Sequence, residues 1–363
     1  MEKSLFEETV KDRITYLEEL IVKEEKASKW NEYLDDLEFL NEILYSQDEF
    51  SFYSYTDKFK TEASELLKRN YLWRTFKSFE TQTNKVLDII PNEKKYEISN
   101  TDLFEITHDF FKYFDQDYFN NFLKIYNNRN SHTKFIARNK PNLAGENYYI
   151  PSLDENFSII YRSFTIDDIF TVIHESTHGT SALINPYHNT NTKDLFAEVD
   201  STFMELVASD YIDKLFNNTE GTLNRIHTHD SHCCNGIDIN DMIRLTKLVG
   251  TKKVSISLLE NIARNRLFIE PQELRTLLDF NYTNKMSRLL GYMIAIQLYE
   301  IYKKDPDKAK FIFKRFILNI KSSEKEYYEW FLEEGINPSD NIKKYHNNIN
   351  QDIQRLTRKP NNL

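Results

Sequence analysis

The sequence is poor in the residues that make turns and cross-links. Its 363 residues include only 7 glycines, 8 prolines and 2 cysteines. Scarce glycine and proline argue against a turn-rich all-β fold and favour long helices. The two cysteines, Cys233 and Cys234, are adjacent. A disulfide between neighbours is strained, so we expect no disulfide framework.

A basic surface and long apolar runs are also lacking. The net charge is −10, with both signs spread along the chain, which argues against a nucleic-acid-binding protein. The most apolar segment after the N-terminal region, "LLGYMIAIQLYEIY" (289–302), is shorter than the ~20 residues of a membrane span. The charged start of the chain has no apolar signal-peptide core. We therefore expect a cytoplasmic protein that binds neither nucleic acid nor membrane.

The pattern of apolar residues divides the chain into two regions. From residue 4 to about 126, apolar residues recur at three- and four-residue spacing, which predicts helices. Between 127 and 164, Asn, Pro and Gly separate short β-prone runs, which predicts a small sheet of two to four strands. Helical periodicity then returns. We predict an N-terminal helical region or lid over 1–130. A second region over 131–363 would hold the sheet (about 132–164) and the C-terminal helices.

A histidine pair marks the first candidate site. The segment "TIDDIFTVIHESTHGTSALI" (165–184) predicts a helix, with Thr165 and Asp168 at the spacing of a capping box. His174 and His178 are four residues apart, so both rings project from one face and fit one metal ion. Glu175 borders that face and is placed to deprotonate a water molecule. These five letters, His-Glu-x-x-His, also occur by chance, so a third ligand is needed.

Glu198 is the candidate for that third ligand. It lies 20 residues after His178 in "NTKDLFAEVDSTFMELVASDYIDKLF" (191–216), which predicts the next long helix. An antiparallel pair of helices would bring Glu198 beside the two histidines. A surface glutamate is the simpler alternative. Three protein ligands and one open position are the arrangement of a catalytic zinc site.

These two segments resemble the catalytic core of the thimet oligopeptidase and oligoendopeptidase F peptidases. That family has a His-Glu-x-Gly-His helix followed by a helix with Ala-Glu-Val-x-Ser-Thr-x-x-Glu, and "AEVDSTFME" matches the second pattern closely. The resemblance covers about 145–216, is fainter over 282–320 and is absent from the N-terminal third. It implies a mainly α, gluzincin-type zinc-peptidase fold with a small sheet next to the active-site helix.

The resemblance also implies residue roles. One zinc ion would be held by His174, His178 and Glu198, with Glu175 as the general base and Glu205 as a supporting carboxylate. "ENYYIPSLDENFSIIYRSF" lies where the family has the sheet whose edge binds the substrate backbone.

The chain departs from the family where the substrate carbonyl would be polarised. The family has a His and several Tyr just before the glycine that matches Gly291, whereas this chain has "LLDFNYTNKMSRLLG". Tyr282, Tyr292 or Arg288 would have to substitute. Ser176-Thr177 also replaces the family's pair between the histidines.

A second cluster of potential ligands, "IHTHDSHCCNG" (226–236), contains three histidines and both cysteines. A polar loop near the mouth of the site is the simplest interpretation. A second metal site and a source of the missing oxyanion donor, with His229 and His232 as candidates, are the alternatives. The isolated histidines, His108, His132, His188 and His346, are expected at the surface.

We therefore predict a zinc metallopeptidase that hydrolyses short or unfolded peptides. Two alternatives remain. One is a catalytically impaired pseudo-peptidase that binds peptides or proteins and keeps the zinc site as structure. The other is a helical scaffold in which the motif is accidental, and such a protein would bind no stoichiometric zinc. The sequence indicates neither substrate preference nor oligomeric state.

Overall fold

The structure is a computed structural model that describes residues 5–23, 36, 40, 76, 98–138, 144–188, 195–249, 264, 270 and 282–357. Side chains at 18–19, 21–23, 243–249 and 282–284 are outside this description. Most of the predicted N-terminal helical region therefore lies outside the described residues. The proposed division near residue 130 stays a prediction. It falls close to the end of α6 at His132, where the first strand follows directly.

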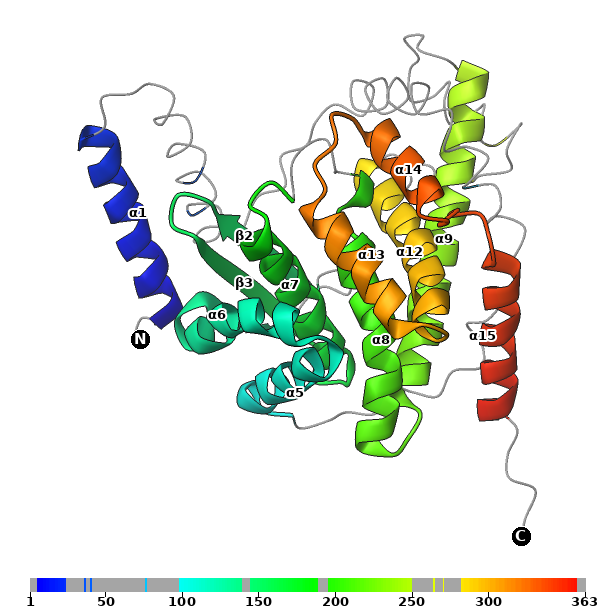
Figure 1. Cartoon of the computed structure of the whole chain (residues 1–363), viewed down its shortest axis with the longest axis horizontal. Helices are drawn as coiled ribbons and strands as arrows, with labels where there is room; N and C mark the ends of the chain where they lie inside the picture. Colours follow the sequence, from blue (N-terminus) through cyan, green and yellow to red (C-terminus); the bar gives the residue numbers. More distant parts are fainter. Residues whose placement is uncertain are drawn as a thin grey trace.

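The described chain is mainly helical with one small sheet, as predicted (Figure 1). The helices are α1 (Leu5–Lys23), α5 (Asn100–Phe114), α6 (Gln116–His132), α7 (Asp167–Ile184), α8 (Val199–Phe216), α9 (Glu220–Val249), α12 (Tyr282–Tyr302), α13 (Pro306–Leu318), α14 (Glu324–Glu333) and α15 (Ile342–Thr357). The strands are β1 (Thr133–Ala137), β2 (Gly145–Ile150) and β3 (Glu155–Arg162). Three strands fall within the predicted range of two to four.

The sheet has the order β1-β3-β2, with β1 parallel and β2 antiparallel to the central β3. Strand β3 is buried along most of its length because α7 packs against the sheet. Strand β2 pairs with β3 alone among the described strands, so it is an edge strand of the described sheet. Helix α7 lies between this sheet and α8 (Figure 1).

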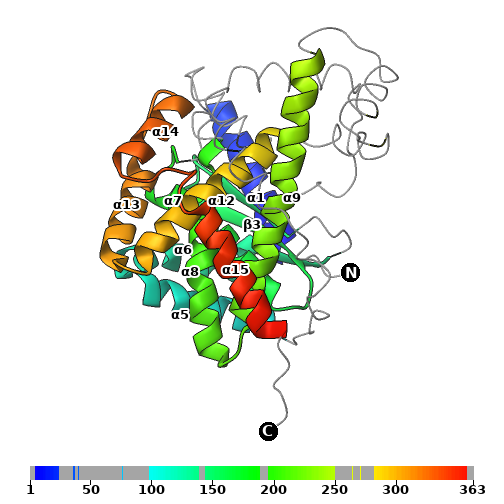
Figure 2. The same cartoon turned by 90° about the vertical axis from the view of Figure 1, so that its right-hand side faces the viewer.

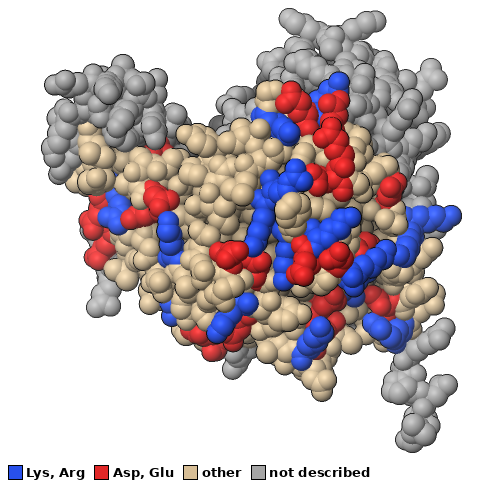
Figure 3. Space-filling model, in the orientation of Figure 1, with Lys and Arg blue, Asp and Glu red and all other residues tan. Residues whose placement is uncertain are grey.

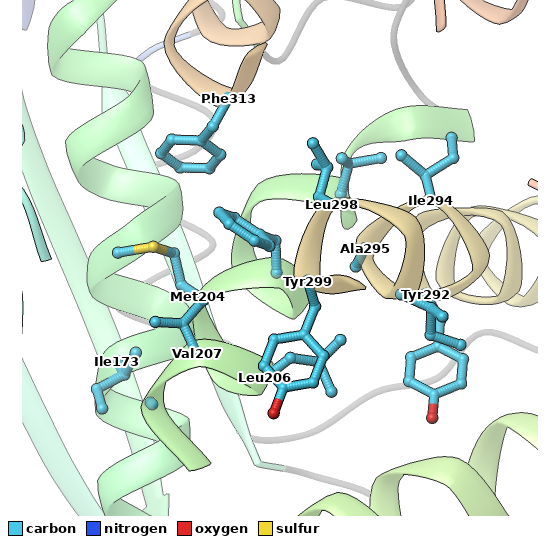
Figure 4. Close-up of a cluster of buried hydrophobic side chains, with 14 of the residues drawn as sticks. Ile173, Met204, Leu206, Val207, Tyr292, Ile294, Ala295, Leu298, Tyr299 and Phe313 are labelled. Atoms are coloured by element: carbon cyan, nitrogen blue, oxygen red, sulfur yellow. The ribbon is translucent and has the colours of Figure 1, made fainter. Parts of the chain in front are cut away.

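Helix α8 is at the centre of the helical part and contacts α7, α9 and α12. Figure 4 shows how the core forms around it. Ile173 of α7, Met204 and Val207 of α8, Leu298 of α12 and Phe313 of α13 point into one apolar cluster. All five are at most 2% exposed. Burying such side chains contributes roughly 1.5–3 kcal/mol each. The same packing fixes α7 and α8 relative to each other, and both helices border the candidate site.

The predicted capping box at Thr165 and Asp168 is wrong. Helix α7 has no side-chain cap, and the Asp168 carboxylate instead accepts hydrogen bonds from the backbone amides of Ser163 and Phe164, at 2.7 and 3.0 Å. Asp168 also pairs with Arg162, and both side chains are buried. Arg162, at the end of β3, attracts the Asp168 carboxylate, and the capping-box spacing takes no account of such a partner.

The isolated histidines are not surface residues. His132, His188 and His346 are at most 7% exposed, and only His108 is partly exposed. Each buried ring has a polar contact that offsets part of the cost of its burial. His132 lies 3.4 Å from Glu155, and His188 lies 3.1 Å from Asp200. His346 lies 3.0 Å from the ring nitrogen of His229.

Among the described residues, no helix combines the length and the apolar character of a membrane span. On the face drawn in Figure 3, acidic and basic side chains are interspersed. Figure 2 shows α15 crossing beside α9, which it contacts.

A partly buried ion pair joins helix α1 to the sheet. Arg13 of α1 donates two hydrogen bonds of 2.6 Å to the two oxygens of Glu155, the first residue of β3. Burial tends to raise the pKa of Glu155. The contacts with His132 and Arg13 outweigh it and lower that pKa to about 2.

This ion pair predicts an acid-sensitive contribution to stability. A carboxyl whose pKa falls from 4.5 to about 2 on folding stabilises the protein above pH 4.5 and loses that effect as pH falls toward 2. Glu155→Gln should therefore lower the free energy of unfolding at pH 7, with a difference from wild type that shrinks in acid. Urea titrations at several pH values measure it, with the exposed Glu8→Gln as control. A difference independent of pH would contradict the assignment.

Candidate metal centre and active site

A cleft with a volume of about 850 Å³ lies between the sheet and the helices. Four elements supply most of its walls: β2, α7, α9 and the turn that leads into α8. The lining includes Gly145, Glu146, Asn147, Tyr148, His174, Glu175, His178, Glu198, Glu205, His227, His232 and Arg288. The three predicted ligands and the predicted base thus open into one cavity.

The predicted ligand atoms converge on one point. The Nε2 atoms of His174 and His178 are 3.1 Å apart, and Oε2 of Glu198 is 3.3 and 3.6 Å from them. Donors around a tetrahedral zinc ion, each about 2.0–2.1 Å from the metal, are separated by about 3.3–3.4 Å. These residues therefore fit zinc in both donor type and spacing.

Glu198 occupies its position through a turn and not through a helix, contrary to the predicted helix over 191–216. Helix α8 begins at Val199, and Glu198 is the residue just before it. The backbone of α12 comes very close there. A Cβ atom on Gly291 would lie 2.8 Å from the carbonyl carbon of Glu198, far inside van der Waals contact. Glycine at 291 is therefore required by the approach of α12 to the Glu198 turn.

Two further carboxylates surround the histidines. Glu205 of α8 hydrogen-bonds Nδ1 of His174, and its supporting role at a metal site stays a prediction. Asp200 faces Nδ1 of His178 at 3.5 Å. Burial tends to raise the pKa of Glu198 and Asp200, but the adjacent histidines lower both well below their usual range. The same contacts raise the pKa values of His174 and His178, so the carboxylates and the histidines are electrostatically coupled.

Asp200 was not among the predicted site residues. It is fully buried, and its other oxygen lies 3.1 Å from Nε2 of His188, itself 1% exposed. His188 and Asp200 therefore form a buried chain that ends on His178, one of the predicted ligands. A signal was present in "AEVDSTFME", because each ligating histidine needs a partner for its second ring nitrogen and Glu205 could serve only one of them.

Glu175 is 6% exposed, and its burial raises its pKa. It lies against strand β2, where a Cβ atom on Gly145 would come within 2.6 Å of its carboxylate. The absence of a side chain at 145 leaves room for this carboxylate between the strand and the metal ligands. A carboxyl with a raised pKa is suited to accept a proton and pass it on.

The candidates for the far wall of the cleft are separated by the structure. Tyr292 is fully buried, and its hydroxyl lies 3.0 Å from Nδ1 of His229. Neither residue lines the cleft. Tyr282 is the first residue of α12, and its side chain lies outside the described residues. By contrast, Arg288 and His232 both line the cleft.

The segment 226–236 is not a loop. It lies within α9, a 30-residue helix, so its histidines and cysteines are distributed over different helix faces. His227 and His232 line the cleft, whereas His229 and Cys233 are buried elsewhere. The density of polar residues suggested a loop. A buried face nevertheless follows from three- and four-residue spacing of Ile226, His229, Cys233, Gly236 and Asn240.

Solved structures show the same fold, although no family model and no curated protein matches the sequence. The chain resembles a protein assigned as an oligoendopeptidase F, with a TM-score of 0.53 and 13% identity over 92% of this chain and 66% of that one. A second similar structure is a protein from Bacillus anthracis that is also assigned as an oligoendopeptidase F. Its TM-score is 0.52, with 13% identity over 90% of this chain and 64% of that one. PZ peptidase A, solved with an inhibitor, has a TM-score of 0.53 and 12% identity over 92% of this chain and 66% of that one.

The predicted fold is thereby confirmed: this is the helical fold of the oligoendopeptidase F structures, with its small sheet. The chain spans about two thirds of the length of these structures. At 12–13% identity the likeness concerns the fold, so the chemistry of this chain has to be argued from its own residues.

The buried Asp200 predicts an effect on metal affinity. Asp200→Asn keeps the size of the side chain but removes the charge that orients His178. We expect zinc affinity to fall by roughly 10–100-fold, as for other partners of metal ligands. Competition with a chromophoric chelator measures it. Asp210→Asn, also on α8 but paired with Arg225, is the matched control. Equal affinities for Asp200→Asn and wild type would contradict this role.

Proposed function

We propose that the chain is a zinc-dependent metallopeptidase that hydrolyses short or unfolded peptides. The observation that carries this proposal is the convergence of His174, His178 and Glu198, beside the buried Glu175, in a cleft along a strand edge. When bound, zinc would lower the pKa of a water molecule and polarise the peptide carbonyl. Three protein ligands leave the open position that this chemistry needs.

Glu175 is proposed as the general base. Its carboxylate would take a proton from the attacking water and deliver it to the leaving amine, so the residue returns to its starting state after each cycle. His174 and His178 would be held as ligands through Glu205 and Asp200 on their far ring nitrogens. The base and the ligands come from one helix, α7, which sets their relative positions.

Strand β2 is proposed as the substrate-binding element. Successive side chains of a strand point to opposite faces. Four consecutive residues, Gly145 to Tyr148, nevertheless line the cleft. The cleft therefore runs along the strand edge, whose amides and carbonyls can pair with an extended peptide. Such pairing recognises a backbone, so it suits short or unfolded substrates.

Arg288 is proposed to stabilise the oxyanion. Arg288 lines the cleft. Its charge lowers the pKa of Glu175, although burial has the larger and opposite effect there. It also lowers the pKa of His232. Burial, reinforced by Arg288, lowers the pKa of His232 to about 3, so this ring is neutral at pH 7. A cation and a neutral imidazole on the same wall would take the place of the Tyr and His that the sequence lacks.

The base assignment predicts the effect of Glu175→Gln. Loss of general-base catalysis should lower kcat for peptide cleavage by roughly 10²–10⁴-fold, while zinc remains bound. Metal analysis and a peptide-digest mass spectrum of wild type and variant measure both quantities. Glu329→Gln, an exposed residue of α14, is the control. Unchanged cleavage by Glu175→Gln would contradict the role of Glu175.

A catalytically impaired, peptide-binding protein is the second candidate. The observation in its favour is that Tyr292 is buried away from the cleft. Cleavage of a peptide library by wild type separates the two candidates, and Arg288→Met tests the role of Arg288 in the first. In a peptidase we expect kcat to fall by roughly 10²–10³-fold with little change in zinc content. If wild type binds zinc and peptides but cleaves no member of a peptide library, the impaired protein is the correct description.

A further inference from the structure

A second group of metal-binding side chains lies outside the cleft. His229 and Cys233 are four residues apart on α9, so both side chains project from one face of that helix. His346 of α15 meets them there. One donor atom from each of the three residues lies within 4.8 Å of the other two. None of the three lines the cleft around His174 and His178.

The group is buried and its histidines are neutral. His229, Cys233 and His346 are 1%, 7% and 6% exposed. Burial and the neighbouring His346 lower the pKa of His229 to about 3, and burial lowers the pKa of His346 as well. Neutral imidazole is the form that ligates a metal. Nε2 of His229 and Nδ1 of His346 are 3.0 Å apart, near the roughly 3.3 Å between two nitrogen ligands of one zinc ion.

The surroundings orient His229 as a ligand. Its Nδ1 lies 3.0 Å from the hydroxyl of Tyr292, so an N–H there can donate to the hydroxyl oxygen. This tautomer leaves a lone pair on Nε2, which lies 3.0 Å from Nδ1 of His346. A hydrogen bond that fixes the second ring nitrogen is a regular feature of ligating histidines.

We propose that His229, Cys233 and His346 bind a second zinc ion that joins α15 to α9, with a water molecule as its fourth ligand. Thiolate and imidazole are the donors that zinc prefers in structural sites. Binding converts the Cys233 thiol to a thiolate and releases one proton to solvent, so occupancy weakens as pH falls. Helix α15 also packs Ile342, Ile349 and Ile353 into the apolar core and forms the ion pairs Arg225–Asp352 and Lys344–Glu300, each 3.2 Å long. A metal ion would add a link between α15 and α9 to this packing.

Cobalt substitution tests the proposal independently of peptidase activity. Thiolate ligation produces an intense charge-transfer absorption in the near ultraviolet, which a site built from two histidines and a glutamate lacks. Reduced, metal-free full-length chain is titrated with Co²⁺, and metal content is measured after loading with Zn²⁺. We expect two ions per chain and the charge-transfer band. One ion per chain without the band overturns the proposal.

Matched variants assign the ligands. Cys233→Ser should bind one ion and lose the band, whereas Cys234→Ser, which changes the exposed neighbour, should bind two and keep it. Glu198→Gln combined with His174→Ala should bind one ion and keep the band, which shows that the two sites are separate. A band that survives Cys233→Ser, or one that is lost in the His174 and Glu198 variant, overturns the assignment. The wild-type spectrum alone remains decisive if a variant fails to fold.

Discussion

The candidate site depends on the close approach of α12 to the turn that carries Glu198. Because Gly291 has no side chain, the backbone of α12 can pack directly on the Glu198 carbonyl, where a Cβ atom would be only 2.8 Å away. That contact, together with the apolar packing of α7 against α8, brings Glu198 to within 3.6 Å of both His174 and His178. The carboxylates that orient the histidines, Asp200 and Glu205, then follow from the helical spacing of α8, since both belong to the helix that starts at Val199. The positions of Glu198, Asp200 and Glu205 beside the histidines of α7 therefore depend on Gly291 and on the start of α8 at Val199.

Much of this could be predicted from the sequence because it depends on local periodicity. The four-residue spacing of His174 and His178 requires only that the segment be helical, and the alternation of apolar runs with Asn, Pro and Gly over 127–164 was sufficient to predict the sheet. Glu198 was identifiable because a glutamate beside apolar residues needs a partner. Its exact backbone setting was not, since a helix start depends on contacts with α12, a segment about 90 residues away in sequence.

Long-range partners account for what sequence reasoning missed. Asp168 has the spacing of a cap, but the buried Arg162 and the Ser163 amide compete for its carboxylate. His188 and His346 look isolated in the sequence, yet each meets a polar partner from another element. The stretch 226–236 looks like a loop because its composition is polar. In the folded chain it is a helix that places His227 and His232 in the cleft and His229 and Cys233 against His346 of α15. Composition reports how polar a segment is, but not how its polar groups are divided among neighbours.

The edge of strand β2 also has a consequence for the free protein. Along that edge β2 pairs with no other described strand, and the unpaired edge of a strand is a template for pairing with another chain. The hydrogen-bonding pattern of a strand edge does not distinguish a peptide from the same strand in another copy of the chain. At high concentration, edge-to-edge association between copies would therefore compete with peptides for the cleft. The charged Glu146 on this strand opposes such association, because pairing two copies would bring like charges together.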